Sequence, residues 1–249
     1  YDQYVRTSFW LGSDGSLVRT SQSANSWKVD GISLNDGYLT GVESATFANI
    51  SVNLRADART DLTADGASDV VWYNASAGVA NYFDMDNGAV SSWNFAGYVN
   101  NTWTARYTGD LNGDGNSDIL YRRGSDGAIG FLKNVGGTWS WQGTGIVNAA
   151  WDIVAVTDTN NDGIADIVYR NDGLGGAMGV LTMNSSGVGT WNGGGFVNTA
   201  WTAVGSGDTN FDGRSEVIFW NGALGVTGSY DLNGTWRQIG VAISPDWTV

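Results

Sequence analysis

A nine-residue segment that begins at Asp110 carries side chains suited to binding a hard cation. Carboxylate or amide oxygens stand at its first, third, fifth and ninth positions, which are Asp110, Asn112, Asp114 and Asp118. Ca²⁺ takes roughly six to eight oxygen ligands at about 2.3–2.6 Å. Alternate side chains of a tight loop can point inward together, and the backbone carbonyl of Asn116 can add another oxygen. Gly115 permits the sharp turn, because glycine has no Cβ to clash at positive φ.

The same pattern recurs three more times along the chain. The predicted ligand sets, each with the backbone-carbonyl donor in fourth place, are Asp61, Thr63, Asp65, Ala67 and Asp69; Asp158, Asn160, Asp162, Ile164 and Asp166; and Asp208, Asn210, Asp212, Arg214 and Glu216. One such loop alone would also fit an Asx turn at the surface. Four copies at near-constant spacing favour about four Ca²⁺ sites. These loops are not EF-hands, because an apolar, strand-like run follows each of them where a helix would be needed.

The composition indicates a globular, acidic chain without thiol or imidazole chemistry. Hydrophobic residues make up 42% of the 249 residues and charged residues 15%, with 37 Gly, 13 Trp and one Pro. Abundant glycine and aromatic residues among short apolar runs are typical of all-β architecture with tight turns. The net charge of −13 disfavours nucleic-acid binding, which needs clustered Lys and Arg. Since Cys and His are absent, disulfides, zinc–thiolate sites and Ser-His triads are excluded.

The loops belong to a longer repeat. They start at residues 61, 110, 158 and 208, so the spacing is 49, 48 and 50 residues. A Trp stands seven residues before three of the loops, at Trp103, Trp151 and Trp201, and a short apolar run follows every loop. The pattern therefore predicts four short strands in each repeat, with the acidic loop between the first strand and the second. Four strands in a period of about 40–50 residues are typical of a propeller blade.

The two ends of the chain predict how the ring closes. Residues 1–34 resemble the last three strands of a blade, and residues 244–249 resemble a first strand. Together they would complete one shared blade and leave no free sheet edge. The prediction is an all-β, single-domain, five-bladed β-propeller over residues 1–249, built of four-stranded antiparallel blades, with further blades starting near 57, 103, 151 and 201. Residues 35–56, which contain Glu43, are expected to be an insertion.

The loops, and the Asp-Ile-Val-Tyr run that follows one of them, resemble the FG-GAP/VCBS repeats. The resemblance covers residues from about 57 to 249. The resemblance implies a β-propeller with Ca²⁺ in the loops between the first two strands of a blade. It also implies a secreted or cell-surface protein with a role in adhesion or carbohydrate binding. It assigns no particular residue to a sugar site.

The connections between repeats offer one set of candidate ligand-binding residues. A sugar ring has an apolar face and a rim of hydroxyls, so its sites pair an aromatic side chain with amide or carboxylate groups. The candidates are Tyr98, Asn100, Trp103, Asn148, Trp151, Phe196, Asn198 and Trp201. Repeated weak sites would act through avidity. The three repeated Trp residues would equally fit packing between blades.

Two other functional readings stay open on the sequence alone. The chain could be a structural or adhesive surface module whose partners are cell-surface or matrix proteins rather than glycans. It could also be a glycoside-active enzyme, which would need two opposed carboxylates. No such pair stands out beyond the loops, so no catalytic residue is predicted and the chain is expected not to be an enzyme. Neither membrane insertion nor a particular oligomeric state is predicted.

Overall fold

The computed structural model describes residues 60–86 and 88–239 and four short strands nearer the N-terminus. The chain divides into two compact units, Tyr1–Asp57 and Ala58–Val249. In the first unit, β1 (Ser8–Leu11) pairs with β2 (Leu17–Thr20), and β3 (Ala45–Phe47) pairs with β4 (Ile50–Val52), both antiparallel. Glu43 lies outside the described residues. The expectation of a single propeller domain over residues 1–249 stays a prediction.

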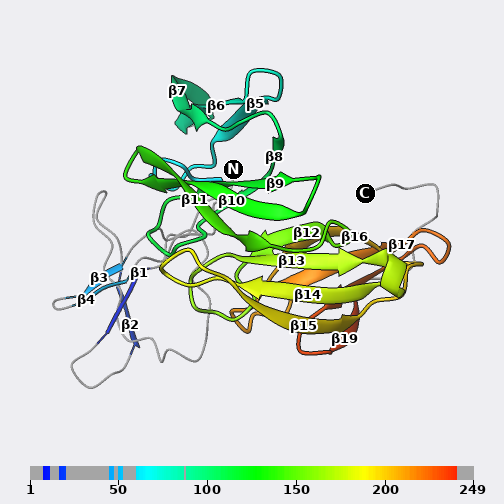
Figure 1. Cartoon of the computed structure of the whole chain (residues 1–249). Coiled ribbons are helices and arrows are strands. Elements are labelled where there is room, and N and C mark those ends of the chain that lie inside the picture. The colour runs from blue at the N-terminus through cyan, green and yellow to red at the C-terminus, as the bar shows by residue number, and fades with distance from the viewer. Residues whose placement is uncertain are drawn as a thin grey trace. The chain divides into compact units, whose positions relative to one another are not determined.

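The second unit is a β-propeller arrangement of antiparallel blades that follow one another in chain order (Figure 1). Its strands are β5 (Val70–Asn74), β6 (Val79–Asp86) and β7 (Ala89–Tyr98); β8 (Trp103–Gly109), β9 (Asp118–Arg123), β10 (Ala128–Val135) and β11 (Thr138–Ile146); β12 (Asp152–Thr157), β13 (Asp166–Asn171), β14 (Ala177–Thr182) and β15 (Thr190–Phe196); and β16 (Thr202–Gly207), β17 (Glu216–Asn221), β18 (Val226–Tyr230) and β19 (Trp236–Ile239). A 3-10 turn, η1 (Asp172–Leu174), joins β13 to β14. The strand order predicted for each repeat is confirmed in the last three blades.

The structure shows four blades rather than the predicted five. Three blades have four strands, and the blade β5–β7 has three described strands. Residues 53–59, which precede its acidic loop, lie outside the described part of the chain. The fifth blade was inferred from residues 1–34 and 244–249. In the first of these segments, the described strands β1 and β2 form a two-stranded sheet with each other. Residues 244–249 are not among the described residues.

Glycine is required at the turn between the second and third strands of a blade. Gly176 has a φ of 91°, and a Cβ there would lie 1.8 Å from the carbonyl oxygen of Val197. The N–H of Val197 donates a 2.9 Å hydrogen bond to the Gly176 carbonyl, which ties the turn to the end of the outer strand. Gly127 and Val147 repeat this arrangement one blade earlier, where the added Cβ would lie 1.9 Å from the Val147 oxygen. This close approach explains part of the high glycine content.

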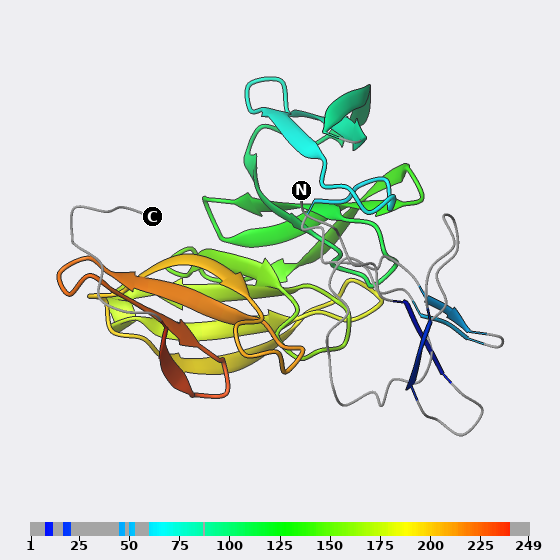
Figure 2. The ribbon, with the colours of Figure 1, turned by 180° about the vertical axis from the view of Figure 1, so that it is seen from behind.

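The core consists of three apolar clusters that lie between successive blades. One joins β5–β7 to β8–β11 around Tyr82 and Tyr121, the next joins β8–β11 to β12–β15 around Phe131 and Tyr169, and the last joins β12–β15 to β16–β19 around Phe219. Strands in the middle of a blade are therefore covered on both faces. Every residue of β13 is buried, whereas most of β15 is exposed. The view from behind shows the same succession of blades (Figure 2).

The first strands of three blades lie next to one another, with β12 in contact with both β8 and β16. Each carries a β-bulge at the same place, so that Arg106, Val154 and Val204 are left unpaired in the ladder. Together with β5 and Thr60, these strands line an open cavity of about 700 Å³. The unpaired residue of each bulge is part of this lining, together with its neighbours on the strand.

Candidate functional site

The first carboxylate of each acidic loop organises the backbone of that loop. The oxygens of Asp110 accept hydrogen bonds from the backbone N–H groups of Gly113 and Gly115, both at 2.7 Å. Asp208 accepts from Phe211 at 2.6 Å and from Gly213 at 2.9 Å. The chain between them turns through a residue with positive φ in all four loops: Ala64, Gly113, Asn161 and Phe211. The local hydrogen bonding of the first Asp thus produces the tight loop that the sequence predicts.

The fifth-position carboxylate closes the second half of each loop. Asp114 accepts the backbone N–H of Asn116 at 2.9 Å, and Asp162 accepts that of Ile164 at 2.9 Å. The residues predicted to offer a backbone carbonyl are therefore held by their own N–H groups. This arrangement also holds in the other two loops, where Asp65 and Asp212 accept from Ala67 and Arg214.

The ninth-position carboxylate is buried and joins the loop to the sheet. Asp118 is fully buried, and its two oxygens accept the backbone N–H groups of Leu111, at 3.0 Å, and Asn134, at 2.8 Å. Asp69 binds Leu62 and Met85 in the same way. The sequence predicted Asp69 and Asp118 only as metal ligands. The structure shows that they also bind the backbone at the start of their loop and at the end of the third strand of their blade.

Neighbouring loops are hydrogen-bonded to one another, which the sequence does not reveal. The eighth-position N–H of one loop donates to the first-position carbonyl of the loop before it. The three bonds run from Ser117 to Asp61 at 2.7 Å, from Ala165 to Asp110 at 2.8 Å, and from Ser215 to Asp158 at 2.8 Å. The four loops therefore form one continuous chain along the same end of the blades.

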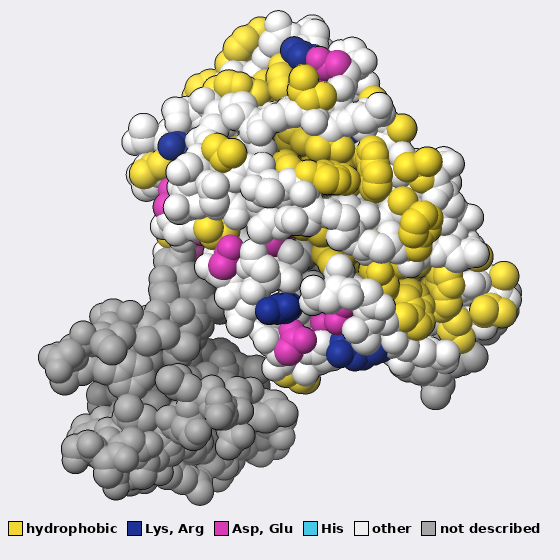
Figure 3. All heavy atoms as spheres, turned by 60° about the horizontal axis from the view of Figure 1, so that its bottom comes forward, with side chains coloured by type: hydrophobic (Ala, Val, Ile, Leu, Met, Phe, Trp, Pro, Cys, Tyr) yellow, Lys and Arg dark blue, Asp and Glu magenta, His cyan; other side chains and the backbone are white. Residues whose placement is uncertain are grey.

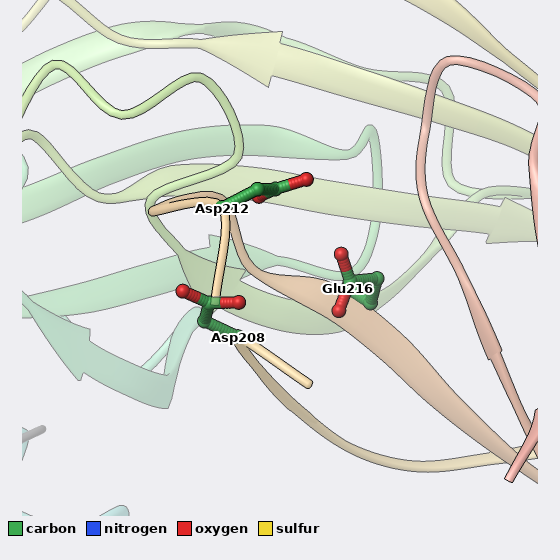
Figure 4. Close-up of side chains that lie close together, drawn as sticks. All are labelled: Asp208, Asp212 and Glu216. Atoms are coloured by element: carbon green, nitrogen blue, oxygen red, sulfur yellow. The ribbon is translucent and has the colours of Figure 1, made fainter. Parts of the chain in front are cut away.

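The last loop brings its carboxylates closest together. Oxygens of Asp208, Asp212 and Glu216 lie within 4.8 Å of one another, and among the described residues no other group of three carboxylates is this compact. Figure 4 shows Asp208 and Asp212 on the loop and Glu216 on the strand that follows it. Glu216 has one more methylene than the Asp of the other loops. Its Oε2 accepts the Thr209 N–H at 2.8 Å, while Oε1 accepts from Asn210 at 2.7 Å.

Two observations indicate that the oxygen-bearing side chains of the loops fit a hard cation. Burial, together with the nearby charges of Asp110 and Asp114, raises the pKa of Asp118 to about 8, although two backbone N–H groups act in the opposite direction. The Oδ1 atom of Asn160, at the third position of its loop, is buried and has no hydrogen-bond partner. Both features are what a bound cation would relieve, since it supplies positive charge and accepts oxygen ligands. The assignment of the individual metal ligands stays a prediction.

Without metal, the protein is expected to lose stability as the pH rises from about 4 to about 8. Burial raises the pKa of Asp118 to about 8 and that of Asp166 to about 6, both from 3.8. Over this range the folded chain binds more protons than the unfolded chain, so the free energy of unfolding falls with increasing pH. Bound calcium should remove most of this dependence, because it replaces the protons.

The check on this pH dependence is thermal unfolding at pH 5, 6.5 and 8, in chelator and in calcium. The sample in calcium serves as the control for other titrating groups. A midpoint in chelator that stays level or rises between pH 5 and pH 8 would contradict the burial of these carboxyl groups.

The candidate ligand-binding residues are near one another in each connection, but several have structural contacts. The side-chain oxygens of Asn100, Asn148 and Asn198 accept backbone N–H groups two residues on, at 2.8–2.9 Å, and so cap the turns. Trp103, Trp151 and Trp201 are half-buried. Their rings pack edge-on against Trp141, Trp191 and Trp236, with centroid distances of 4.9, 5.1 and 4.6 Å. The structure thus shows a packing contact for each of these Trp residues.

Tyr98 and Phe196 differ from the other candidates because they are the last residues of outer strands and are 66% and 65% exposed. The sequence missed further exposed rings on outer strands. These are Trp93, Phe95, Trp141, Trp191 and Trp236. Alternation of aromatic and polar residues along Trp93-Asn94-Phe95 would have been the signal, since alternate residues of a strand share a face.

Comparison with known proteins supports the repeat assignment. Residues 110–169 match the family model of the FG-GAP-like repeat. This segment runs from the second loop to the strand that follows the third. The match and the arrangement of the blades together support an FG-GAP-type propeller. A search of the curated proteins finds no match to the chain. Within the described residues, no helix has the length and apolar character needed to span a membrane.

Proposed function

We propose that this chain is an extracellular, calcium-stabilised propeller that binds carbohydrate in adhesion or recognition. The observation that supports carbohydrate binding is the exposure of aromatic rings on outer strands, above all Trp93 and Phe95 on β7 and Phe196 on β15. Each ring offers a flat apolar face on which a sugar ring can stack. Hydrophobic side chains gather in several groups on the face shown in Figure 3. Exposed apolar patches of this kind mark binding surfaces.

Calcium and the extracellular setting belong to the same proposal. The buried carboxylates and the unpartnered Asn160 oxygen support cation binding in the loops. Extracellular modules typically bind Ca²⁺ with dissociation constants of about 10⁻⁴–10⁻³ M, so such loops would fill outside the cell. FG-GAP repeats are typical of extracellular proteins, which supports the location. Calcium would stabilise the scaffold, and the aromatic side chains would contact the glycan.

The repeat provides several weak sites rather than one strong site. Tyr98, Ile146 and Phe196 occupy the same place at the end of three outer strands, and all three are exposed. Ile146 has no ring, so the aromatic surface is expected to act in the blades that hold Tyr98 and Phe196. Binding to a multivalent glycan surface would then exceed the affinity of either site alone.

Replacing Tyr98 or Phe196 with Ala is expected to weaken glycan binding by about two- to tenfold each, which is the effect of losing one aromatic contact. A glycan array in calcium would identify the ligand, and titration with it would give the affinities. Val135→Ala is the control. Val135 is exposed but lies at the turn of the β10–β11 hairpin, whereas Ile146, the equivalent of Tyr98 and Phe196, lies at the other end of that hairpin.

Two results would overturn the carbohydrate proposal. One is the absence of binding to any glycan while a cell-surface or matrix protein is bound, which would favour the adhesive-module alternative. The other is shortening of a polysaccharide during incubation, since a lectin leaves the chains intact and the proposal assigns no catalytic activity to this chain.

A further inference from the structure

The cavity lined by the first strands of the blades has one cationic side chain in its wall. Among the described residues that line it, Arg106 is the only Lys or Arg and Asp69 is the only carboxylate. Asp69 is 5% exposed, and its oxygens accept the N–H groups of Leu62 and Met85. No described acidic residue forms an ion pair with Arg106, Lys133 or Arg214, whereas Arg122, Arg123, Arg170 and Arg237 each have one. Of the three unpaired cations, only Arg106 lines the cavity. Arg106 is thus a guanidinium group available to a ligand.

The fold does not require arginine at this position. Arg106 is the unpaired residue of the β8 bulge, and the same bulges in β12 and β16 hold Val154 and Val204. Both valines also line the cavity. An aliphatic side chain therefore satisfies the backbone geometry in two of the three blades. The arginine on β8 therefore calls for another explanation, and ligand binding is one that its surroundings support.

The walls around Arg106 combine hydroxyl groups with apolar surface. The hydroxyls of Thr60 and Thr108 are 2.7 Å apart, and the Tyr107 hydroxyl donates to the Ile153 carbonyl at 3.1 Å. Val154 and Val204 form an apolar part of the lining. A volume of about 700 Å³ lies in the range of small-molecule sites, roughly 300–1,000 Å³. A sugar ring, with an apolar face and a hydroxyl rim, matches such walls.

We propose that this cavity binds a sugar that carries one carboxylate group, with Arg106 as its partner. The planar guanidinium of arginine binds a carboxylate through two parallel hydrogen bonds. One cation balances one negative charge, and the chain has a net charge of −13, so a dianion such as a phosphate monoester is disfavoured. This site is separate from the aromatic surface on the outer strands.

The test is calorimetric titration of the whole chain, in calcium, with D-glucuronate, D-glucose and glucose 6-phosphate. We expect D-glucuronate to bind and D-glucose not to bind. Arg106→Val should weaken D-glucuronate binding by about tenfold or more, the effect of losing a charged hydrogen-bond pair. This variant should keep the fold, because the other two bulges already hold valine. Lys133→Val, on β10, removes one positive charge outside the cavity lining and should bind like the parent chain.

The proposal fails if the parent chain does not bind D-glucuronate, or if Arg106→Val binds it as well as the parent does. Tighter binding of glucose 6-phosphate than of D-glucuronate would overturn the choice of a monocarboxylate. Binding to the outer-strand aromatic surface should be the same in the parent chain and in Arg106→Val. Failure of one site is therefore distinguishable from failure of the other.

Discussion

Removing calcium with a chelator is expected to lower the midpoint of thermal unfolding by about 10–20 °C. At a calcium concentration ten times the dissociation constant, one site adds about 1.4 kcal/mol to the free energy of unfolding, and four sites about 6 kcal/mol. In a chain of this size, each kcal/mol shifts the midpoint by about 2–4 °C. The physical cause is mutual repulsion of the loop carboxylates, which the metal removes.

The contacts between loops should make this loss a single transition. Ser117 donates to the carbonyl of Asp61, and Ala165 donates to that of Asp110, so each loop is attached to its neighbour. Asp118 and its equivalents also connect the loops to the sheets. A loop that opens without metal would therefore disturb the adjacent blades rather than unfold alone.

The measurement is thermal unfolding in about 10 mM calcium and again in excess chelator, with the metal-to-protein ratio determined for both samples. About 10 mM is a tenfold excess over the weaker dissociation constants typical of such modules. Asp114→Ala should lower that ratio by one and lower the midpoint. Asp126→Ala is a matched control, because Asp126 is an exposed acid outside the loops that pairs with Arg123. An unchanged midpoint in chelator, with no bound metal in either sample, would show that the loops are Asx turns only.

The sequence predicts the repeat well because the repeat is local. The nine-residue loops, the apolar run after each loop and the order of strands depend on neighbours along the chain. The structure confirms this order in β8–β19. The number of blades depends on pairing between the two ends of the chain, which local patterns do not determine. The prediction of five blades was therefore wrong for this structure.

The contacts at the site were less predictable because they join segments far apart in sequence. The bond from Asn134 to the Leu62 carbonyl, at 2.5 Å, crosses from one blade to the loop of another. Likewise, the cavity position of Arg106 depends on a bulge that no residue pattern marks. The same holds for the two buried arginines, Arg122 on β9 and Arg170 on β13. They donate hydrogen bonds to the carbonyls of Asn148 and Trp201, which lie before or at the start of the next blade. Such partners become visible only when the blades are packed.

Replacing Arg170 with Met is expected to reduce the free energy of unfolding by about 2–4 kcal/mol, because it leaves buried carbonyl groups without a donor. The Arg170 side chain is 6% exposed and donates to the carbonyls of Trp201 at 2.5 Å, Asn198 at 3.2 Å and Val197 at 3.3 Å. It also pairs with Asp172 at 2.7 Å. One side chain thus holds the connection between the β12–β15 blade and the β16–β19 blade.

The matched control is Arg123→Met, which removes the same group from a solvent-exposed position. Arg123 binds Asp126 at 2.6 Å and lies over the Trp103 ring, and because solvent screens this exposed pair, its loss should cost much less than the loss of Arg170. Denaturant unfolding of both variants in saturating calcium would separate this effect from metal binding. Equal costs for the two substitutions would show that Arg170 contributes no more than a surface ion pair. A much larger cost for Arg170→Met would establish that blade-to-blade connections depend on buried arginine as well as on the apolar clusters.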